Sequence, residues 1–457
     1  MKRVLCAVWM SAALGCGTEA PPKFVKVGAV IDRTGSIAAP TWRDDIQLAT
    51  DQANVALNQK AFANLQFHYL LNDSENDPDV ASTRALQTRD QGAVLVVTDT
   101  SRDVISVNRK LNYDPATSTT PLPVVCFACN APSINNPDAT DIDPIAQAAL
   151  RDSSQFVYRV MMSSSLIGRV LLNMVLADGA SGDVNGDGRV KISFYSGDEP
   201  FGTGTVSAVN AAIEVSGRTV LTETILHPAS VDENAYNWGA DLALTDNGYN
   251  ETTRTFDGDT DAVIEVTSFP VAVTRTFLTA NYPRKLFHTQ TFRVPSTIQN
   301  LGLQAEGQSG VAYLDLNGVS GTLFADAFKL MTQTDPIYRD SMAYDAMAVS
   351  YLAVIHAVHT HGLDDPTWVT PEQVRSSLQQ LNDPAGTVIR PGEFGKAIDE
   401  LRAGRTINYE GASGGVDFDA EGNVRNVLVE WTVQSGRFVD VSHFDCATSD
   451  ACVKTGG

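Results

Sequence analysis

Basic residues are scarce in this chain. Its 457 residues include 33 Lys and Arg against 54 Asp and Glu, so the formal net charge is −21 and the pI is near 4.6. Proteins that bind nucleic acid or anionic membrane surfaces use clustered Lys and Arg. No such cluster occurs here, which excludes nucleic acid as a partner and a basic patch as a membrane anchor.

Long apolar runs and enzyme motifs are also missing. Beyond the first twenty residues, no run approaches the ~18 consecutive apolar residues that a membrane-spanning helix needs. The chain has no G-x-S-x-G, no Walker loop and no H-E-x-x-H. What remains is ordinary globular composition, 43% hydrophobic and 19% charged. We therefore expect a non-enzymatic globular protein of two or three domains.

The N-terminus carries an export signal. Lys2 and Arg3 precede an apolar stretch, residues 4–14, which is the pattern of a signal peptide. The small residues before Cys16 resemble a bacterial lipoprotein signal, although Ala13 stands where Leu is usual. We expect residues 1–15 to be removed, Cys16 to be lipidated and residues 16–24 to form a tether. Plain secretory cleavage nearby is the alternative.

Cysteine is rare, and its use fits export. Of six Cys, four lie in the mature globular part: Cys126, Cys129, Cys446 and Cys452. An even number in an exported chain favours disulfides, and three pairings are open. The closest pairs in sequence are Cys446–Cys452 and Cys126–Cys129. A redox dithiol at 126–129 and a four-cysteine zinc site are weaker alternatives, because the first lacks a helix N-terminus and the second joins pairs over 300 residues apart.

Short β-branched segments alternate with amphipathic ones, and the pattern occurs twice. Such alternation predicts doubly wound sheets, and two series imply two lobes that face one another at the carboxyl ends of their strands. The expected strands are residues 25–31, 66–71, 93–97, 124–126, 190–195, 219–226, 262–266, 285–288 and 310–314. The expected helices are residues 41–59, 78–90, 104–111, 164–176, 202–215 and one that ends at 281.

Several motifs in order resemble those of type 1 periplasmic binding proteins of the leucine/isoleucine/valine-binding group. The segments, which together span residues 25 to 440, are Val27–Gly35, Asp73–Pro78, Phe156–Arg159, Phe201–Gly204, Ala343–Ala346, Val416–Asn423 and Gly436–Phe438. The resemblance implies two Rossmann-like lobes joined by a three-strand hinge. We expect lobe one at 25–156 and 312–405, lobe two at 157–311 and 406–440, and a disulfide-bonded tail at 441–457.

The resemblance also implies where lobe one would bind a ligand. The family holds an amino acid's carboxylate with hydroxyl and main-chain groups of two segments, which here read Thr98–Arg102 and Cys126–Asn130. Ser101 or Arg102 falls at the first contact position, and a guanidinium would grip an anion by charge-assisted bonds. Ala128 would offer main-chain groups, and Asn130 replaces a threonine hydroxyl.

Lobe two departs further from the family. The expected contacts are Phe201, Ser268 and Thr291, but the segment that should carry the ammonium-binding carboxylate reads His288–Thr291 and has no acid. An unpaired buried ammonium is costly. Either the ligand is not a standard α-amino acid, or another carboxylate such as Glu265 or Asp99 has taken over.

Two further patterns suggest metals. Asp183, Asn185 and Asp187 occupy positions 1, 3 and 5 of a calcium loop with Gly at 6, but position 12 is Phe194 instead of Glu. A structural Ca²⁺ is therefore the one cofactor considered, with a polar turn as the alternative. The spacing of His356, His359 and His361 could hold a metal. These histidines also sit at a helix end, where they favourably meet the helix dipole, and this is the stronger interpretation.

Together these features predict a lipid-anchored, extracytoplasmic solute-binding protein of a bacterial membrane. It would capture a small polar ligand, an amino acid, amide or related molecule, by hinge closure. Its partner would be an ABC permease of the branched-chain amino acid type. The alternative is a sensing or receptor module of the same fold without transport.

Overall fold

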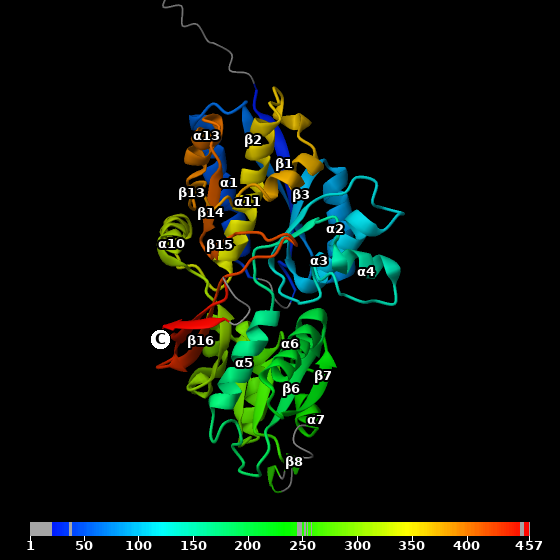
Figure 1. Cartoon of the computed structure of the whole chain (residues 1–457), viewed down its shortest axis with the longest axis vertical. Helices are drawn as coiled ribbons and strands as arrows, with labels where there is room; N and C mark the ends of the chain where they lie inside the picture. The colour runs from blue at the N-terminus through cyan, green and yellow to red at the C-terminus, as the bar shows by residue number, and fades with distance from the viewer. Residues whose placement is uncertain are drawn as a thin grey trace, which may run out of the picture.

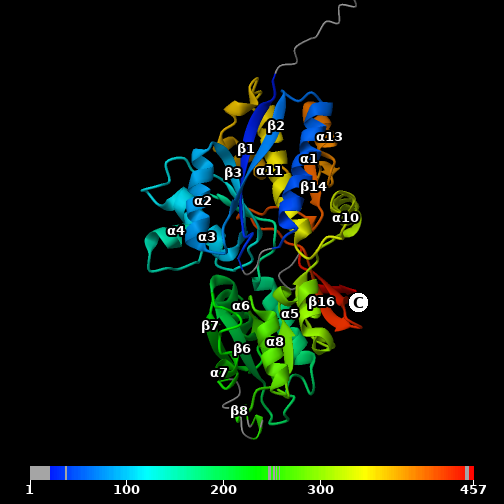
Figure 2. The ribbon, with the colours of Figure 1, turned by 180° about the vertical axis from the view of Figure 1, so that it is seen from behind.

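We describe a computed structural model in which residues 21–35, 39–244, 249–250, 253, 255–256, 258–447 and 452–456 are placed. The expected signal peptide and Cys16 lie outside these residues. The chain forms two α/β lobes, drawn one above the other in Figure 1 and from behind in Figure 2. Lobe one comprises the described residues of 21–159 and 314–415, and lobe two those of 160–313 and 416–456.

A five-stranded parallel sheet of order β2-β1-β3-β4-β5 forms the centre of lobe one. Its two faces are apolar, which is typical of parallel sheets covered on both sides. Ala29 and Val97 pack in the core shared with α1 and α11, and Val30 and Val96 pack against α2 and α3. The elements of this first segment are β1 Lys23–Ile31, α1 Trp42–Gln59, β2 Leu65–Asp73, α2 Pro78–Asp90, β3 Ala93–Thr100, α3 Ser101–Asn108, the π-helical turn Arg109–Tyr113, β4 Val124–Ala128, α4 Pro144–Arg151 and β5 Val157–Arg159.

A later segment of the chain returns to complete lobe one. Its long helix α11 has the length and apolarity of a membrane span, but 94% of its apolar stretch is buried inside the protein, so it is a core helix. The elements are α10 Gly318–Thr332, α11 Asp340–Thr360, the short helix Pro366–Trp368, α12 Pro371–Leu378, β13 Thr387–Ile389, α13 Phe394–Arg402, β14 Ile407–Gly411 and β15 Gly414–Gly415.

An eight-stranded mixed sheet of order β18-β17-β16-β12-β11-β10-β6-β7 forms lobe two. Helices α5 and α6 cover one face through Val170 and Val209; Phe277 of α8 packs in the cluster on the other. The elements are α5 Ser165–Ala177, β6 Lys191–Asp198, α6 Pro200–Ser216, β7 Leu221–Pro228, α7 Trp238–Leu242, β8 Tyr249–Asn250, β9 Thr255–Phe256, β10 Ala262–Val266, α8 Pro270–Thr279, β11 Lys285–His288, the short helix η3 Gln290–Phe292, α9 Pro295–Leu301, the short helix Gly302–Ala305, β12 Ser309–Tyr313, β16 Val427–Gln434, β17 Arg437–Asp445 and β18 Val453–Gly456.

The predicted fold class is confirmed, and two of the expected boundaries need correction. The chain crosses between the lobes after β5, after β12 and after β15. The third crossing was expected at 405, but β14 pairs in parallel with β13 and so keeps residues 407–411 in lobe one. The expected tail from residue 441 is not separate either, because β17 runs to Asp445 on β16 and β18 pairs with β17.

The expected disulfides are present, and of the three open pairings the structure has Cys126–Cys129 with Cys446–Cys452. They lie in different lobes, which rules out a shared zinc site. Cys126 and Cys129 are fully buried, whereas redox-active cysteines are partly exposed. Burial argues against a redox role for this pair and favours a structural disulfide.

The first and third crossings are bonded to each other. Arg159 donates its main-chain N–H to Gly422 O and its Nε to Asn423 Oδ1, each at 2.8 Å. Gly422 has a φ of +78°, and a Cβ there would lie 2.4 Å from Val157 O. Only glycine can adopt this conformation so close to Val157 O. Glycine at position 422 therefore allows the two crossings to pack this closely.

Candidate ligand-binding cleft

A cavity of about 590 Å³ lies between the lobes. Its walls include residues at or just after the carboxyl ends of β3 and β4 in lobe one and of β6, β10 and β11 in lobe two. In open α/β sheets this edge is where ligands bind. The volume is in the range of small-molecule sites.

The seven ligand contacts expected from the sequence all line this cavity: Ser101, Arg102, Ala128, Asn130, Phe201, Ser268 and Thr291. They come from five separate segments, and the fold brings all of them together. Their role in binding stays a prediction, whereas their common location is a property of the structure.

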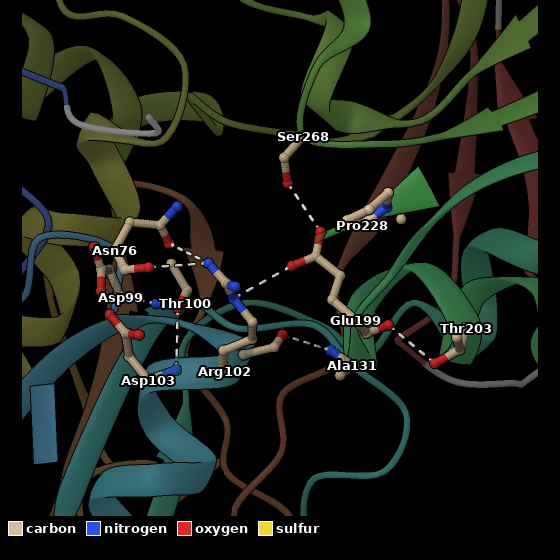
Figure 3. Close-up of polar contacts among 12 residues, drawn as sticks. Asn76, Asp99, Thr100, Arg102, Asp103, Ala131, Glu199, Thr203, Pro228 and Ser268 are labelled. Atoms are coloured by element: carbon tan, nitrogen blue, oxygen red, sulfur yellow. Dashed lines mark hydrogen bonds and ion pairs between the residues drawn. The ribbon is translucent and has the colours of Figure 1, made fainter. Parts of the chain in front are cut away.

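Arg102 and Glu199 connect the two lobes across the cleft. Arg102, in the first turn of α3, places Nε 3.5 Å from Oε2 of Glu199, the residue that precedes α6 (Figure 3). Nη2 of Arg102 also donates to Asn76 O and Oδ1, both at 3.0 Å. Ser268 Oγ donates to Glu199 Oε1 at 3.0 Å. Burial raises the pKa of Glu199, and Arg102 opposes that rise.

Two of the expected contacts also hold the cleft wall in place. Ser101 Oγ accepts a hydrogen bond from Ala131 N at 3.1 Å, and Asn130 Nδ2 donates to Tyr313 Oη at 2.8 Å. Tyr313 ends β12, immediately before the second crossing. Asn130 therefore ties lobe one to the hinge as well as facing the cavity.

Glu199 is a buried carboxylate of lobe two that lines the cavity, whereas the two expected alternatives, Asp99 and Glu265, are engaged elsewhere. The buried Asp99 accepts hydrogen bonds from Asp32 N and Thr100 N, at 2.8 and 2.9 Å, and burial raises its pKa well above the usual value. Glu265 Oε2 lies 2.9 Å from His288 Nδ1 and is buried. Neither residue lines the cavity. An acid directly before a proline at a helix start, as in Glu199-Pro200, is the sequence signal that could have placed this carboxylate at the cleft.

The expected calcium loop forms a turn closed by its own side chains. Asp183 Oδ1 and Oδ2 accept hydrogen bonds from Gly186 N and Gly188 N, at 2.7 and 2.9 Å. Asp187 Oδ1 accepts from Arg189 N at 2.9 Å, and Phe194 is buried. Among the described residues, no group of three or more His, Cys, Asp or Glu is arranged to hold a metal. These residues do not offer a complete calcium site, and calcium binding stays an untested prediction.

Solved structures with the same architecture cover nearly the whole chain. A leucine-binding protein from Thermotoga maritima aligns with 92% of this chain and 99% of its own, with a TM-score of 0.65 and 14% identity. A branched-chain amino acid ABC transporter protein from Thermus thermophilus with bound valine aligns with 94% and 98%, at a TM-score of 0.63 and 14% identity. The chain has the type I periplasmic-binding-protein fold.

Other members of this fold hold different ligands. A solute-binding protein from R. palustris in complex with benzoate covers 95% of this chain and 98% of its own, at a TM-score of 0.63 and 13% identity. At such identities the fold is shared, and the ligand is set by each cleft. No family model matches the sequence.

One curated relative has local sequence similarity. It is the chemotactic signal transduction system substrate-binding protein BasB of Halobacterium salinarum, 41% identical over 78 residues. The match covers 17% of this chain and 17% of the relative. The similarity is therefore local, and the relative's name places it in a chemotaxis system.

Proposed function

We propose that this periplasmic-binding-protein fold captures a small zwitterionic ligand, an amino acid or a related amide, outside the cytoplasm. The observation that carries the proposal is the Arg102–Glu199 pair, a cation from lobe one opposite a carboxylate from lobe two. A ligand carboxylate would bind Arg102 and its ammonium would bind Glu199. Both lobes would then be bridged by the ligand, which favours the closed form.

The charges of this cleft do not suit a simple aromatic acid as the ligand. Glu199 is 9% exposed in its side chain, and a buried carboxylate would repel a ligand that carries only negative charge. The apolar walls at Phe201 and Phe269 accommodate carbon skeleton between the charged ends. The cleft thus favours a molecule with both signs of charge.

The proposal includes delivery of the ligand to an ABC importer of the branched-chain amino acid type, and no enzymatic activity. It also includes lipidation at Cys16, which anchors the mature chain to a bacterial membrane. Replacement of Cys16 by Ala should release the protein from the membrane fraction while ligand binding persists. Retention of the variant in that fraction would contradict the anchor alone.

A thermal-shift screen of the mature chain tests ligand capture. The panel holds amino acids, their amides, peptides, urea and small carboxylates. A ligand at 100 times its dissociation constant stabilises the folded form by ~2.7 kcal/mol, which raises the Tm by several degrees. Unchanged Tm values across the panel would contradict the proposal.

A second function, sensing without transport, is favoured by the local similarity to the substrate-binding protein of a chemotaxis system. The two functions differ in the partner. Uptake of radiolabelled ligand that is lost on deletion of this chain supports transport, whereas unchanged uptake with a lost chemotactic response supports sensing.

A further inference from the structure

Arg339 is a second cation on the cleft wall. It lies just before α11, lines the cavity and has a φ of +80°. Its buried Nε has no hydrogen-bond partner, and within the described chain its side chain forms no ion pair; its guanidinium lies beside the Tyr338 ring, 5.6 Å from the centroid. A guanidinium held at a cavity without an acceptor is available for a ligand.

The backbone around Arg339 is fixed by Asp340. Thr41 Oγ1 donates to Asp340 Oδ1 and Ile337 N donates to Asp340 Oδ2, each at 2.7 Å. The Arg339 carbonyl accepts from Met342 N and Ala343 N, each at 3.1 Å. These bonds engage both carboxylate oxygens of Asp340 and keep residue 339 in its left-handed conformation.

The Thr41–Asp340 bond also joins the two segments that carry Trp42 and Arg339. Trp42 follows Thr41, Arg339 precedes Asp340, and both line the cleft. Trp42 is 2% exposed, and its Nε1 is buried without an acceptor. Indole and guanidinium N–H groups are donors only, so a ligand group that pairs with either of them must be an acceptor, best an anion.

Lobe two adds a polar group without a partner to the same cavity. Gln290, at the start of η3, is 2% exposed, and its Oε1 has no hydrogen-bond partner. Buried polar atoms in native proteins are nearly always paired. Three residues that line one cavity, Trp42, Gln290 and Arg339, each carry a buried polar atom without a partner, which indicates that a polar molecule completes this site.

We propose that Arg339 and Trp42 form a second anion subsite and that the ligand is an acidic amino acid. This rests on the proposed function, in which Arg102 and Glu199 receive the α-carboxylate and the ammonium. Two cations and one carboxylate on the walls then match two carboxylates and one ammonium on the ligand. Glu233 also lines the cleft but is exposed to solvent, where its charge is screened.

Calorimetric titration of the mature chain with L-glutamate, L-glutamine and L-leucine tests this subsite. L-Glutamate should bind at least tenfold more tightly than L-glutamine, which differs only in the side-chain charge. Arg339→Gln should remove that preference and leave L-leucine affinity unchanged. Arg339→Lys, which keeps the charge, should retain part of it and controls for folding of the strained turn.

The outcomes separate this inference from the proposed function. If L-leucine or L-glutamine binds as tightly as L-glutamate in the wild type, or if Arg339→Gln folds and keeps the preference, the second subsite is wrong while amino acid capture stands. If none of the three probes binds, the second subsite is wrong, and the result of the thermal-shift panel then decides the proposed function separately. A glutamate preference that survives in Trp42→Phe but not in Arg339→Gln supports the subsite with Arg339 alone as its anchor.

Discussion

Arg102 Nε of lobe one and Glu199 Oε2 of lobe two lie 3.5 Å apart, with side-chain exposures of 16% and 9%. The pair is therefore partly shielded from solvent. Ion pairs in such surroundings are screened less by salt than those on an open surface. It joins the lobes across the cleft, in addition to the backbone crossings that meet at Arg159 and Gly422.

Arg102→Ala should open the ligand-free protein. Loss of a half-buried interlobe pair removes about 1 kcal/mol from the closed form, which shifts the ratio of open to closed molecules about fivefold. Single-molecule energy transfer between dyes on the two lobes measures the populations. Arg169→Ala, a half-buried arginine of α5 outside the cleft, is the control. Equal populations in both variants would show that the pair does not hold the lobes.

Gly422→Ala should destabilise the hinge. The new Cβ would meet Val157 O at 2.4 Å at a φ of +78°, and the combined strain costs roughly 2–4 kcal/mol of unfolding free energy. Gly217→Ala is the matched control, because its φ is +66° with nothing within 4 Å; it loses only the conformational cost of ~1 kcal/mol. Chemical denaturation measures both, and equal losses would refute the close approach.

Much of the fold could be predicted from the periodicity of apolar residues in the sequence. Which carboxylate faces the cleft was shown only by the structure. The expected strand at 262–266 and helix at 78–90 match β10 and α2 residue for residue. The wrong crossing at 405 arose because β14 looks like a hinge strand but pairs with β13. Asp99 and Glu265 were plausible from their places within strands, yet their carboxylates bond inside the protein. A sequence does not show which way such a side chain points.

Asp345 of α11 should be essential for stability, because it binds the segment that leads to the third crossing. Its buried carboxylate accepts from Tyr409 Oη, Ala412 N and Ser413 N, each at 2.8 Å, and from Ser413 Oγ at 2.7 Å. Asp345→Ala leaves these donors without an acceptor and should cost about 3 kcal/mol or more. Asp326→Ala, at an exposed position of α10, should change stability by less than ~0.5 kcal/mol. A similar small effect of both would contradict the role of Asp345.

Asp45→Asn should flatten the pH dependence of stability. Burial raises the pKa of Asp45 well above its usual value, and burial raises the pKa of the neighbouring Asp340 to about 7. The unfolded pKa of an aspartate is ~3.9, so between about pH 4 and 7 the folded state binds more protons than the unfolded state. Stability from these groups is then present at low pH and is lost as the pH rises.

Thermal unfolding from pH 5 to 8 measures this effect. The Tm of the wild type should fall more steeply with pH than that of Asp45→Asn, whose amide does not titrate and can donate to Asp340. Asp51→Asn, at an exposed position of the same helix, should keep the wild-type slope. Parallel curves for all three proteins would show that the buried pair is not the cause.

The central claim is that a ligand bridges Arg102 and Glu199 through its two charged ends. Calorimetric titration of the mature chain with L-glutamate, N-acetyl-L-glutamate and L-glutamate α-amide tests it most directly, because each derivative removes one end. The account predicts that L-glutamate binds and that each derivative loses at least tenfold in affinity, or ~1.4 kcal/mol. Equal binding of the N-acetyl derivative and of L-glutamate would contradict it.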